Sequence, residues 1–352
     1  MKQYSIATTV IITLMLAANG FGAEETASVK SHRTDWFQAA KWGVFTHYMA
    51  DTVIKGEEIT VEKWNKAVDS FDVQALANQL ASIGAGYYVI TLGQNSGYYC
   101  SPNAAYDGYV GYNPSHCSKR DLVADLYEAL HAKGIRLMVY LPSGAPDRDP
   151  VACKALEWQA GKHPLWTYKD GKPGEADPRL ESFQRKWESV IREWSSRWGA
   201  KVSGWWFDGC YYPDAMYRFP DPPNFESFAA AARAGNPDSI VAFNPGVLYP
   251  VVTQTPFEDY TAGEINEPEK VVCTGRWVEQ AQFQMLSYLG PSWCQSPPRF
   301  TPDQIITFTR NLVDKGGVAT WDAPPAGVNG QIPEAFLAQF TALGKALGTA
   351  KE

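Results

Sequence analysis

Short apolar runs alternate with longer amphipathic stretches over most of the chain. The runs are rich in β-branched and aromatic residues and have the length of buried strands. They cover residues 41–48, 87–93, 135–142, 202–210, 240–246, 257–264, 283–293 and 317–324. Near-continuous apolar character is typical of parallel strands that are covered on both faces of their sheet. The pattern therefore predicts an α/β protein with a parallel sheet.

The stretches between the runs carry helix signals. They cover residues 73–83, 119–132, 178–198, 302–315 and 333–347. Gly84 and Gly134 follow two of these stretches as helix-ending residues, and Thr301 precedes another as an N-cap. This alternation of strands and helices fits both an open doubly wound sheet and a closed barrel.

Length and motif content favour the barrel. The chain has 352 residues, and no Gly-x-Gly-x-x-Gly motif follows the first predicted strand, which argues against a dinucleotide-binding sheet. Eight strands in a chain of this size fit a (β/α)₈ barrel. Without an internal repeat, a linker or a break in composition, we predict one domain over residues 24–352.

The N-terminal segment resembles a signal peptide over residues 1–23. Lys2 gives it a positive start, residues 6–18 are mostly apolar, and small residues follow. The apolar stretch is shorter than the about 20 residues that a membrane span needs, so we expect a secreted or periplasmic protein without a membrane span after cleavage. Export permits disulfides, and Cys100 and Cys117, which flank one loop, are the predicted pair.

Charge and composition narrow the class of partner. The net charge is −7 and Lys and Arg do not cluster, which argues against a nucleic-acid partner. The chain has 13 Trp and 18 Tyr, and aromatic faces are good platforms for sugar rings, which favours an oligosaccharide or polysaccharide substrate. The cysteine spacing fits no zinc motif, so neither a metal nor an organic cofactor is predicted. Oligomeric state stays open.

Barrel enzymes carry their chemistry at the C-terminal ends of the strands. The residues at those ends are His47, Gln94, Asn95, Ser143, Asp208, Asn244, Glu264 and Asp322. The set contains three carboxylates and no Ser-His-Asp order or nucleophile elbow. Paired carboxylates of this kind are typical of glycoside hydrolysis, in which one group attacks or activates water and the other donates a proton.

Asp208 is the first candidate for such a carboxylate, because it follows Trp205, Trp206 and Phe207 at the end of a predicted strand. As an Asp before Gly it could also cap the following turn. For the second carboxylate, residues 257–264 offer Glu258 and Glu264, and the residues alone do not rank one above the other.

Several segments, in order, resemble the α-L-fucosidases of glycoside hydrolase family 29. Residues 41–48, KWGVFTHY, are similar to that family's first strand, KFGIFIHW, and residues 206–209, WFDG, match its nucleophile strand. Residues 120–123, RDLV, are similar to the start of its second helix, and 315–333 to its last strand and loop. The resemblance implies Asp208 as nucleophile and Glu264 as acid/base, with Glu258 as the alternative. It also implies a barrel that lacks the family's common C-terminal β-sandwich.

The chain differs from the family at positions that bind the sugar in family members. Gln94 and Asn95 stand in place of two histidines, and Asn244 is followed by no Arg. The predicted substrate-binding residues are His47, Gln94, Asn95, Trp206, Tyr211, Asn244 and Asp322. The resemblance therefore implies a retaining exo-glycosidase for terminal α-L-fucosyl or related residues. The alternatives are an enzyme for a different or substituted L-sugar, such as α-L-galactose, and a non-catalytic carbohydrate-binding barrel.

Overall fold

The computed structural model describes residues 32–158, 179–211 and 213–350. The predicted signal peptide, residues 1–23, lies outside the described residues. Within them, no helix is both long and apolar enough to cross a membrane. Residues 32–40 are helical and lead into the first strand.

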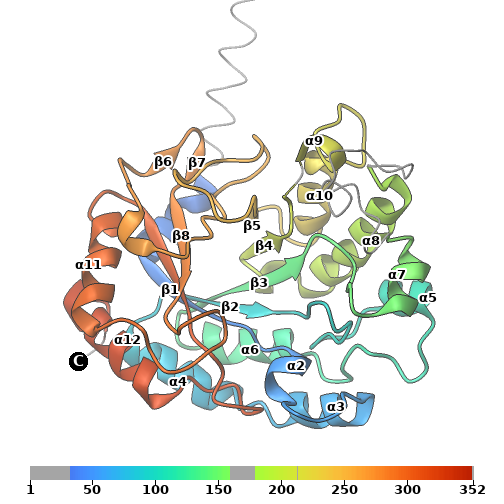
Figure 1. The fold of residues 1–352 in the computed structure, drawn as a ribbon, viewed down its shortest axis with the longest axis horizontal. Helices are drawn as coiled ribbons and strands as arrows, with labels where there is room; N and C mark the ends of the chain where they lie inside the picture. The colour runs from blue at the N-terminus through green and yellow to red at the C-terminus, as the bar shows by residue number, and fades with distance from the viewer. Residues whose placement is uncertain (1–31, 159–178, 212, 351–352) are drawn as a thin grey trace, which may run out of the picture.

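A sheet of seven parallel strands forms the centre of the molecule (Figure 1). Its order is β5-β4-β3-β2-β1-β9-β8, so strands that follow one another in sequence mostly lie side by side. The strands are β1 Trp42–Thr46, β2 Tyr87–Thr91, β3 Arg136–Pro142, β4 Gly204–Asp208, β5 Ile240–Phe243, β8 Gln284–Tyr288 and β9 Val318–Asp322. Seven of the eight predicted strands are thus confirmed, each within a few residues. A small antiparallel pair, β6 Trp277–Val278 and β7 Ala281–Gln282, precedes β8.

The eighth predicted strand, residues 257–264, is not a strand in the structure. The segment instead makes two isolated parallel bridges, Tyr260 to Gln282 and Glu264 to Leu286. Asp259 N also donates to Val241 O of β5 at 2.8 Å, so the segment lies between β5 and β8. A left-handed residue interrupts it, because Gly263 has φ 57° and a Cβ there would lie 1.9 Å from Gln284 O. Glycine is required at this close approach.

Helices cover the outer side of the sheet (Figure 1). The helices of the described residues are α2 Ala50–Val53, α3 Val61–Asp69, α4 Val73–Ile83, α5 Ala104–Val110, α6 Leu122–His131, α7 Pro150–Leu156, α8 Glu181–Trp198, α9 Pro213–Met216, α10 Phe225–Ala232, α11 Pro302–Val313 and α12 Glu334–Leu347, with 3₁₀ turns at Gly199–Lys201 and Pro268–Lys270. The five predicted helices are confirmed. Helix α6 begins later than predicted, because Asp121 caps it through Ala124 N. Thr301 caps α11 as predicted, in a capping box with Gln304.

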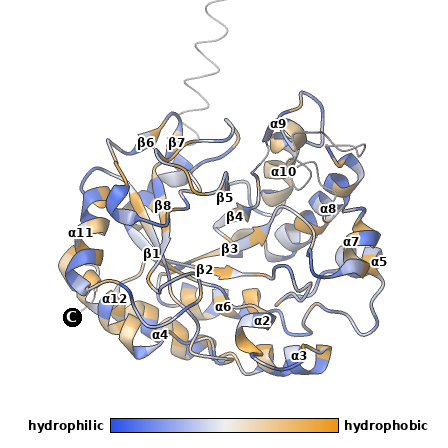
Figure 2. Cartoon of the chain, in the orientation of Figure 1, coloured by the Kyte–Doolittle hydropathy of each residue, from blue (hydrophilic) through white to orange (hydrophobic). Residues whose placement is uncertain are grey.

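The core has two layers, one on each face of the sheet. The larger layer lies between strands and helices, and both kinds of element are mostly apolar where they meet (Figure 2). The smaller layer comes from the opposite face of the strands and contains Phe45, Val89, Met138, Tyr140, Trp206, Tyr260 and Leu286. Side chains from well-separated parts of the chain therefore pack together on this face of the sheet, beneath the strand ends that carry the polar candidates.

The predicted Cys100–Cys117 disulfide is wrong, since all six cysteines are free. Tyr99, and not Cys100, lies opposite Cys117 in a backbone bridge. The Cys100 thiol points instead toward Thr91 O of β2, at 3.6 Å. The loop brings the two cysteines near each other but turns one thiol into the core.

Candidate active site

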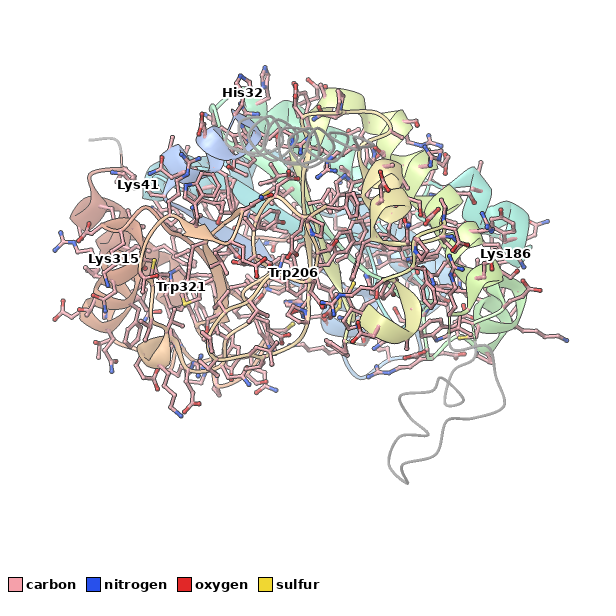
Figure 3. The ribbon with its side chains drawn as sticks, turned by 90° about the horizontal axis from the view of Figure 1, so that it is seen from above. His32, Lys41, Lys186, Trp206, Lys315 and Trp321 are labelled. Carbon is pink, nitrogen blue, oxygen red and sulfur yellow. The ribbon has the colours of Figure 1, made fainter. Side chains whose placement is uncertain are left out.

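The C-terminal ends of the strands surround one cavity of about 250 Å³. Its lining residues are His47, Met49, Gln94, Tyr140, Trp206, Asp208, Glu264, Leu286, Trp293 and Cys294. Trp206 lies near the middle of the molecule in Figure 3, with Trp321 to one side. The strands thus bring together side chains that are far apart in sequence, as the rule for barrel enzymes predicted.

Asp208, the last residue of β4, receives hydrogen bonds on both carboxylate oxygens. Oδ1 accepts from Gly209 N at 2.8 Å, from Asn244 Nδ2 at 2.8 Å and from Tyr211 Oη at 3.2 Å. Oδ2 accepts from Tyr140 Oη at 2.5 Å. Four donors aimed at one side chain fix its position. Only the bond from Gly209 N belongs to the following turn, as the turn-capping interpretation of Asp208 predicted.

Asn244, which follows β5, joins Asp208 to Glu264. Its Nδ2 lies 2.8 Å from Asp208 Oδ1 and 2.7 Å from Glu264 Oε2, so the two oxygens are at most about 5.5 Å apart. Gly246 N donates to Asn244 Oδ1 at 3.0 Å, which fixes which end of the amide faces the carboxylates. Asn244 is fully buried, and its Nδ2 group donates one hydrogen bond to Asp208 and one to Glu264.

Glu264 is held in place by backbone pairing of its neighbours with β8. Leu286 N donates to Gly263 O at 2.8 Å, and Ile265 N donates to Leu286 O at 2.9 Å. Burial raises the pKa of Glu264 above its usual range; the Asn244 hydrogen bond lowers it, and the charge of Asp208 raises it further. A carboxyl group in this environment keeps its proton to higher pH than a free one.

His47 and Asp322 form a buried pair at one side of the cavity, with Nδ1 and Oδ1 2.8 Å apart. Burial lowers the pKa of His47, but Asp322 and the neighbouring Cys294 together outweigh it, and the pKa lies well above its usual value. Asp322 Oδ2 also accepts from Cys294 N at 3.1 Å. Asp322, predicted to contact substrate or to hold a neighbouring loop, is not among the lining residues; it orients His47 and the loop at Cys294.

Tyr140 and Gln94 support the nucleophile candidate from the neighbouring strands. Gln94 Nε2 donates to Tyr140 Oη at 2.6 Å, and Tyr140 in turn donates to Asp208. Burial, and then the charge of Asp208, hold the pKa of Tyr140 well above its usual value, so the phenol remains a donor. Trp206 stacks on Tyr140 with 5.3 Å between ring centroids and donates from Nε1 to Ala262 O at 3.0 Å.

Sequence reasoning missed several lining residues, namely Met49, Tyr140, Leu286, Trp293 and Cys294. Strand alternation could have found Tyr140, because it lies two residues after Met138 on the same inward face of β3, close to the end of that strand. No sequence signal distinguishes Trp293 and Cys294 from other residues of the long loop after β8.

Glu258, the alternative acid/base, is not in the cavity. Its carboxylate is buried and accepts from Gln254 N at 2.5 Å and from Phe243 N at 3.4 Å. These are backbone groups, so Glu258 holds the turn before residue 258 against β5. The structure therefore favours Glu264 over Glu258.

Two further predicted residues lie at the edge of the site or outside it. Tyr211 is 45% exposed at the rim, and only its hydroxyl reaches Asp208. Asn95 is not among the lining residues, and its carbonyl accepts from Arg148 N at 2.9 Å. Gln94 alone of the adjacent amides faces the cavity.

Comparison with solved structures gives the same fold at low sequence identity. An endo-fucoidan hydrolase of glycoside hydrolase family 107, MfFcnA4, superposes with a TM-score of 0.67 at 18% identity, over 90% of this chain and 54% of the other. The chain thus spans about half the length of that enzyme. The α-L-fucosidase AlfC from Lactobacillus casei, in complex with α-L-fucose, gives a TM-score of 0.60 at 17% identity, over 89% of this chain and 97% of the other. A search of curated protein sequences gives no match.

A match to a protein-family model identifies the family of the chain. The sequence pattern described as Alpha-L-fucosidase matches residues 60–352, which is most of the chain and includes Asp208, Asn244 and Glu264. The match agrees with the resemblance found in the sequence motifs and with the carboxylate pair in the cavity. The chain belongs to the α-L-fucosidase family.

Proposed function

We propose that this protein is a retaining exo-glycosidase that releases terminal α-L-fucosyl residues from glycans. The observation that carries the proposal is the bridge from Asn244 to both Asp208 and Glu264, which keeps the two carboxylate oxygens within about 5.5 Å. Retaining enzymes hold their carboxyl groups ~5–5.5 Å apart, whereas inverting enzymes need ~6.5–9.5 Å to admit a water molecule.

In the first step, Asp208 attacks the anomeric carbon as the bond from that carbon to the glycosidic oxygen breaks. Glu264 gives its proton to the departing oxygen, and its raised pKa supports this role as an acid. In the second step, Glu264 takes a proton from water, the water oxygen attacks the anomeric carbon, and the bond to Asp208 breaks. Both steps use only groups of this chain, water and the glycoside.

The size and lining of the cavity support a single terminal sugar. Its volume of about 250 Å³ is below the ~300–1,000 Å³ of pockets for drug-sized ligands, which suits one pyranose ring. Met49, Leu286 and Trp293 give the lining an apolar part. Such a surface suits the methyl group of fucose better than the hydroxymethyl group of α-L-galactose.

Two further features belong to the same proposal. We propose that residues 257–264 complete an eight-stranded barrel, on the strength of their bonds to β5 and β8. We also propose export of the protein, on the strength of the apolar segment within residues 1–23.

Release of 4-nitrophenol from aryl α-L-fucoside and α-L-galactoside tests the proposal. Wild type is expected to hydrolyse the fucoside faster, and Asp208→Ala to lose activity by several orders of magnitude. Asp238→Ala, which removes an exposed Asp outside the cavity, is the matched control and should retain activity. Binding of L-fucose without turnover of any glycoside would contradict the proposal in favour of a carbohydrate-binding barrel. Activity that survives in Asp208→Ala would contradict the assignment of the nucleophile.

A further inference from the structure

Three side chains of different chemistry meet at the wall of the cavity. Among the residues that the structure describes, one group of His, Cys and acidic side chains has metal-ligand spacing: His47, Cys294 and Asp322. One nitrogen, one sulfur and one carboxylate oxygen of this group all lie within 4.8 Å of one another. They come from the loops after β1 and β8 and from the end of β9, so only the fold brings them together.

The donor set matches that of an open zinc site. Zinc bonds of about 2.0–2.3 Å in a tetrahedron put neighbouring ligand atoms about 3.3–3.8 Å apart, so small side-chain movements would suffice. Three protein ligands leave the fourth position open. That position faces the cavity, because His47 and Cys294 both line it.

The charges of the group would also balance. A thiolate, a carboxylate and a neutral imidazole together neutralise one divalent cation, so no net charge is left in a largely buried site. Hydrogen bonds already orient two of the ligands: Asp322 Oδ1 holds the His47 ring, and Asp322 Oδ2 accepts from Cys294 N at 3.1 Å. The thiol also distinguishes this group from a simple His–Asp pair, since sulfur favours zinc and cadmium over magnesium and calcium.

We propose that His47, Cys294 and Asp322 form a binding site for a thiophilic divalent cation, Zn²⁺, and that the bound ion excludes the sugar from the cavity. On binding, the Cys294 thiol and the protonated His47 ring each release one proton to solvent, and new bonds form from the metal to Sγ, to a ring nitrogen and to a carboxylate oxygen. The ion then occupies the wall against which the sugar would lie. The bound ion is thus inhibitory and plays no part in turnover. The inhibition rests on the proposed function, whereas the metal binding does not.

Cadmium titration tests the binding without any substrate. The protein, freed of metal with a chelator and then desalted, is titrated with Cd²⁺ while the ultraviolet sulfur-to-cadmium charge-transfer band is recorded. Wild type is expected to show one equivalent of the band. Cys273→Ser, which removes a buried thiol outside the cavity, should match wild type, whereas Cys294→Ser should lose the band. A missing band in wild type, or a band that persists in Cys294→Ser, would overturn the site.

Two further measurements complete the test. Calorimetric titration with Zn²⁺ is expected to show Kd at least about tenfold weaker for Asp322→Asn, which keeps the size of the side chain but removes its charge. In the aryl fucoside assay, Zn²⁺ should raise KM and leave kcat unchanged for wild type. Zinc that lowers kcat alone, or that activates the enzyme, would overturn the inhibitory role. Absence of hydrolysis with the cadmium band present would count against the proposed function and leave the metal site standing.

Discussion

At the scale of single residues, the site depends on how polar groups are shared between two carboxylates. Asn244 donates to Asp208 and to Glu264 from the same nitrogen, and Tyr140 donates to the other oxygen of Asp208. These contacts separate the roles of two chemically similar groups. Asp208 is held in place by four donors, whereas the pKa of Glu264 is raised chiefly by burial.

Replacing Asn244 by Ala removes the donor common to both carboxylates. We expect Asn244→Ala to lower kcat by about 100-fold, because a fixed donor aimed at the reacting groups contributes that much in other enzymes. Asn95→Ala is the matched control, since it removes an amide of an adjacent loop that does not line the cavity. Steady-state kinetics on the aryl fucoside check the prediction. Equal losses in both variants would contradict the bridging role.

The raised pKa of Glu264 has a consequence for stability that needs no substrate. A folded-state pKa above the unfolded value of about 4.5 means that the folded protein binds this proton more tightly, so its stabilising effect is present at low pH and is lost as pH rises through the folded pKa. Glu264→Gln cannot ionise. The free energy of unfolding of Glu264→Gln minus that of wild type should therefore increase as pH rises. The same difference should become smaller toward pH 4.

Urea denaturation at several pH values measures this difference. Glu226→Gln, an exposed change on α10, serves as the reference for the loss of one negative charge. A stability gain of Glu264→Gln that grows as pH falls would contradict the assigned direction of the pKa shift.

At the scale of the elements, the apolar runs located seven strands, because these strands are buried on both faces, and the amphipathic periodicity located five helices, because each helix buries one face. The segment 257–264 could not be predicted in the same way. Its course depends on the left-handed Gly263 and on contact with Gln284 of β8, which lies about 20 residues further along the chain. The same dependence explains why the residues alone could not rank Glu258 against Glu264.

Glu258 stabilises the packing of a turn against β5 and takes no part in the proposed reaction. We expect Glu258→Gln to lower the free energy of unfolding by about 2 kcal/mol, because an amide cannot accept on both sides from the backbone groups of Gln254 and Phe243. The kcat of the folded variant should stay within about twofold of wild type, whereas Glu264→Gln should lose most of its kcat. Denaturation and kinetics on both variants check this contrast. A large loss of kcat in Glu258→Gln with unchanged stability would reverse the assignment.

At the scale of the whole molecule, the candidate catalytic and binding side chains lie at one end of the parallel sheet, where the strands have their C-terminal ends. The rule for strand ends predicted Asp208, Glu264, His47 and Gln94 in one cavity, and all four line it. The rule could not show that Asp322 points at His47 or that the loop after β8 carries Cys294 to the same wall. Those contacts depend on loop conformations, for which hydrophobic periodicity gives no signal.

The order in which the anomers of the released sugar appear tests the central claim most directly. Proton NMR of wild type acting on an aryl α-L-fucoside follows the sugar before its anomers equilibrate. Two carboxylates held within about 5.5 Å by Asn244 predict that α-L-fucose forms first, because two displacements at the same carbon restore its configuration. If β-L-fucose forms first, a single displacement by water has occurred, and Asp208 is not the nucleophile.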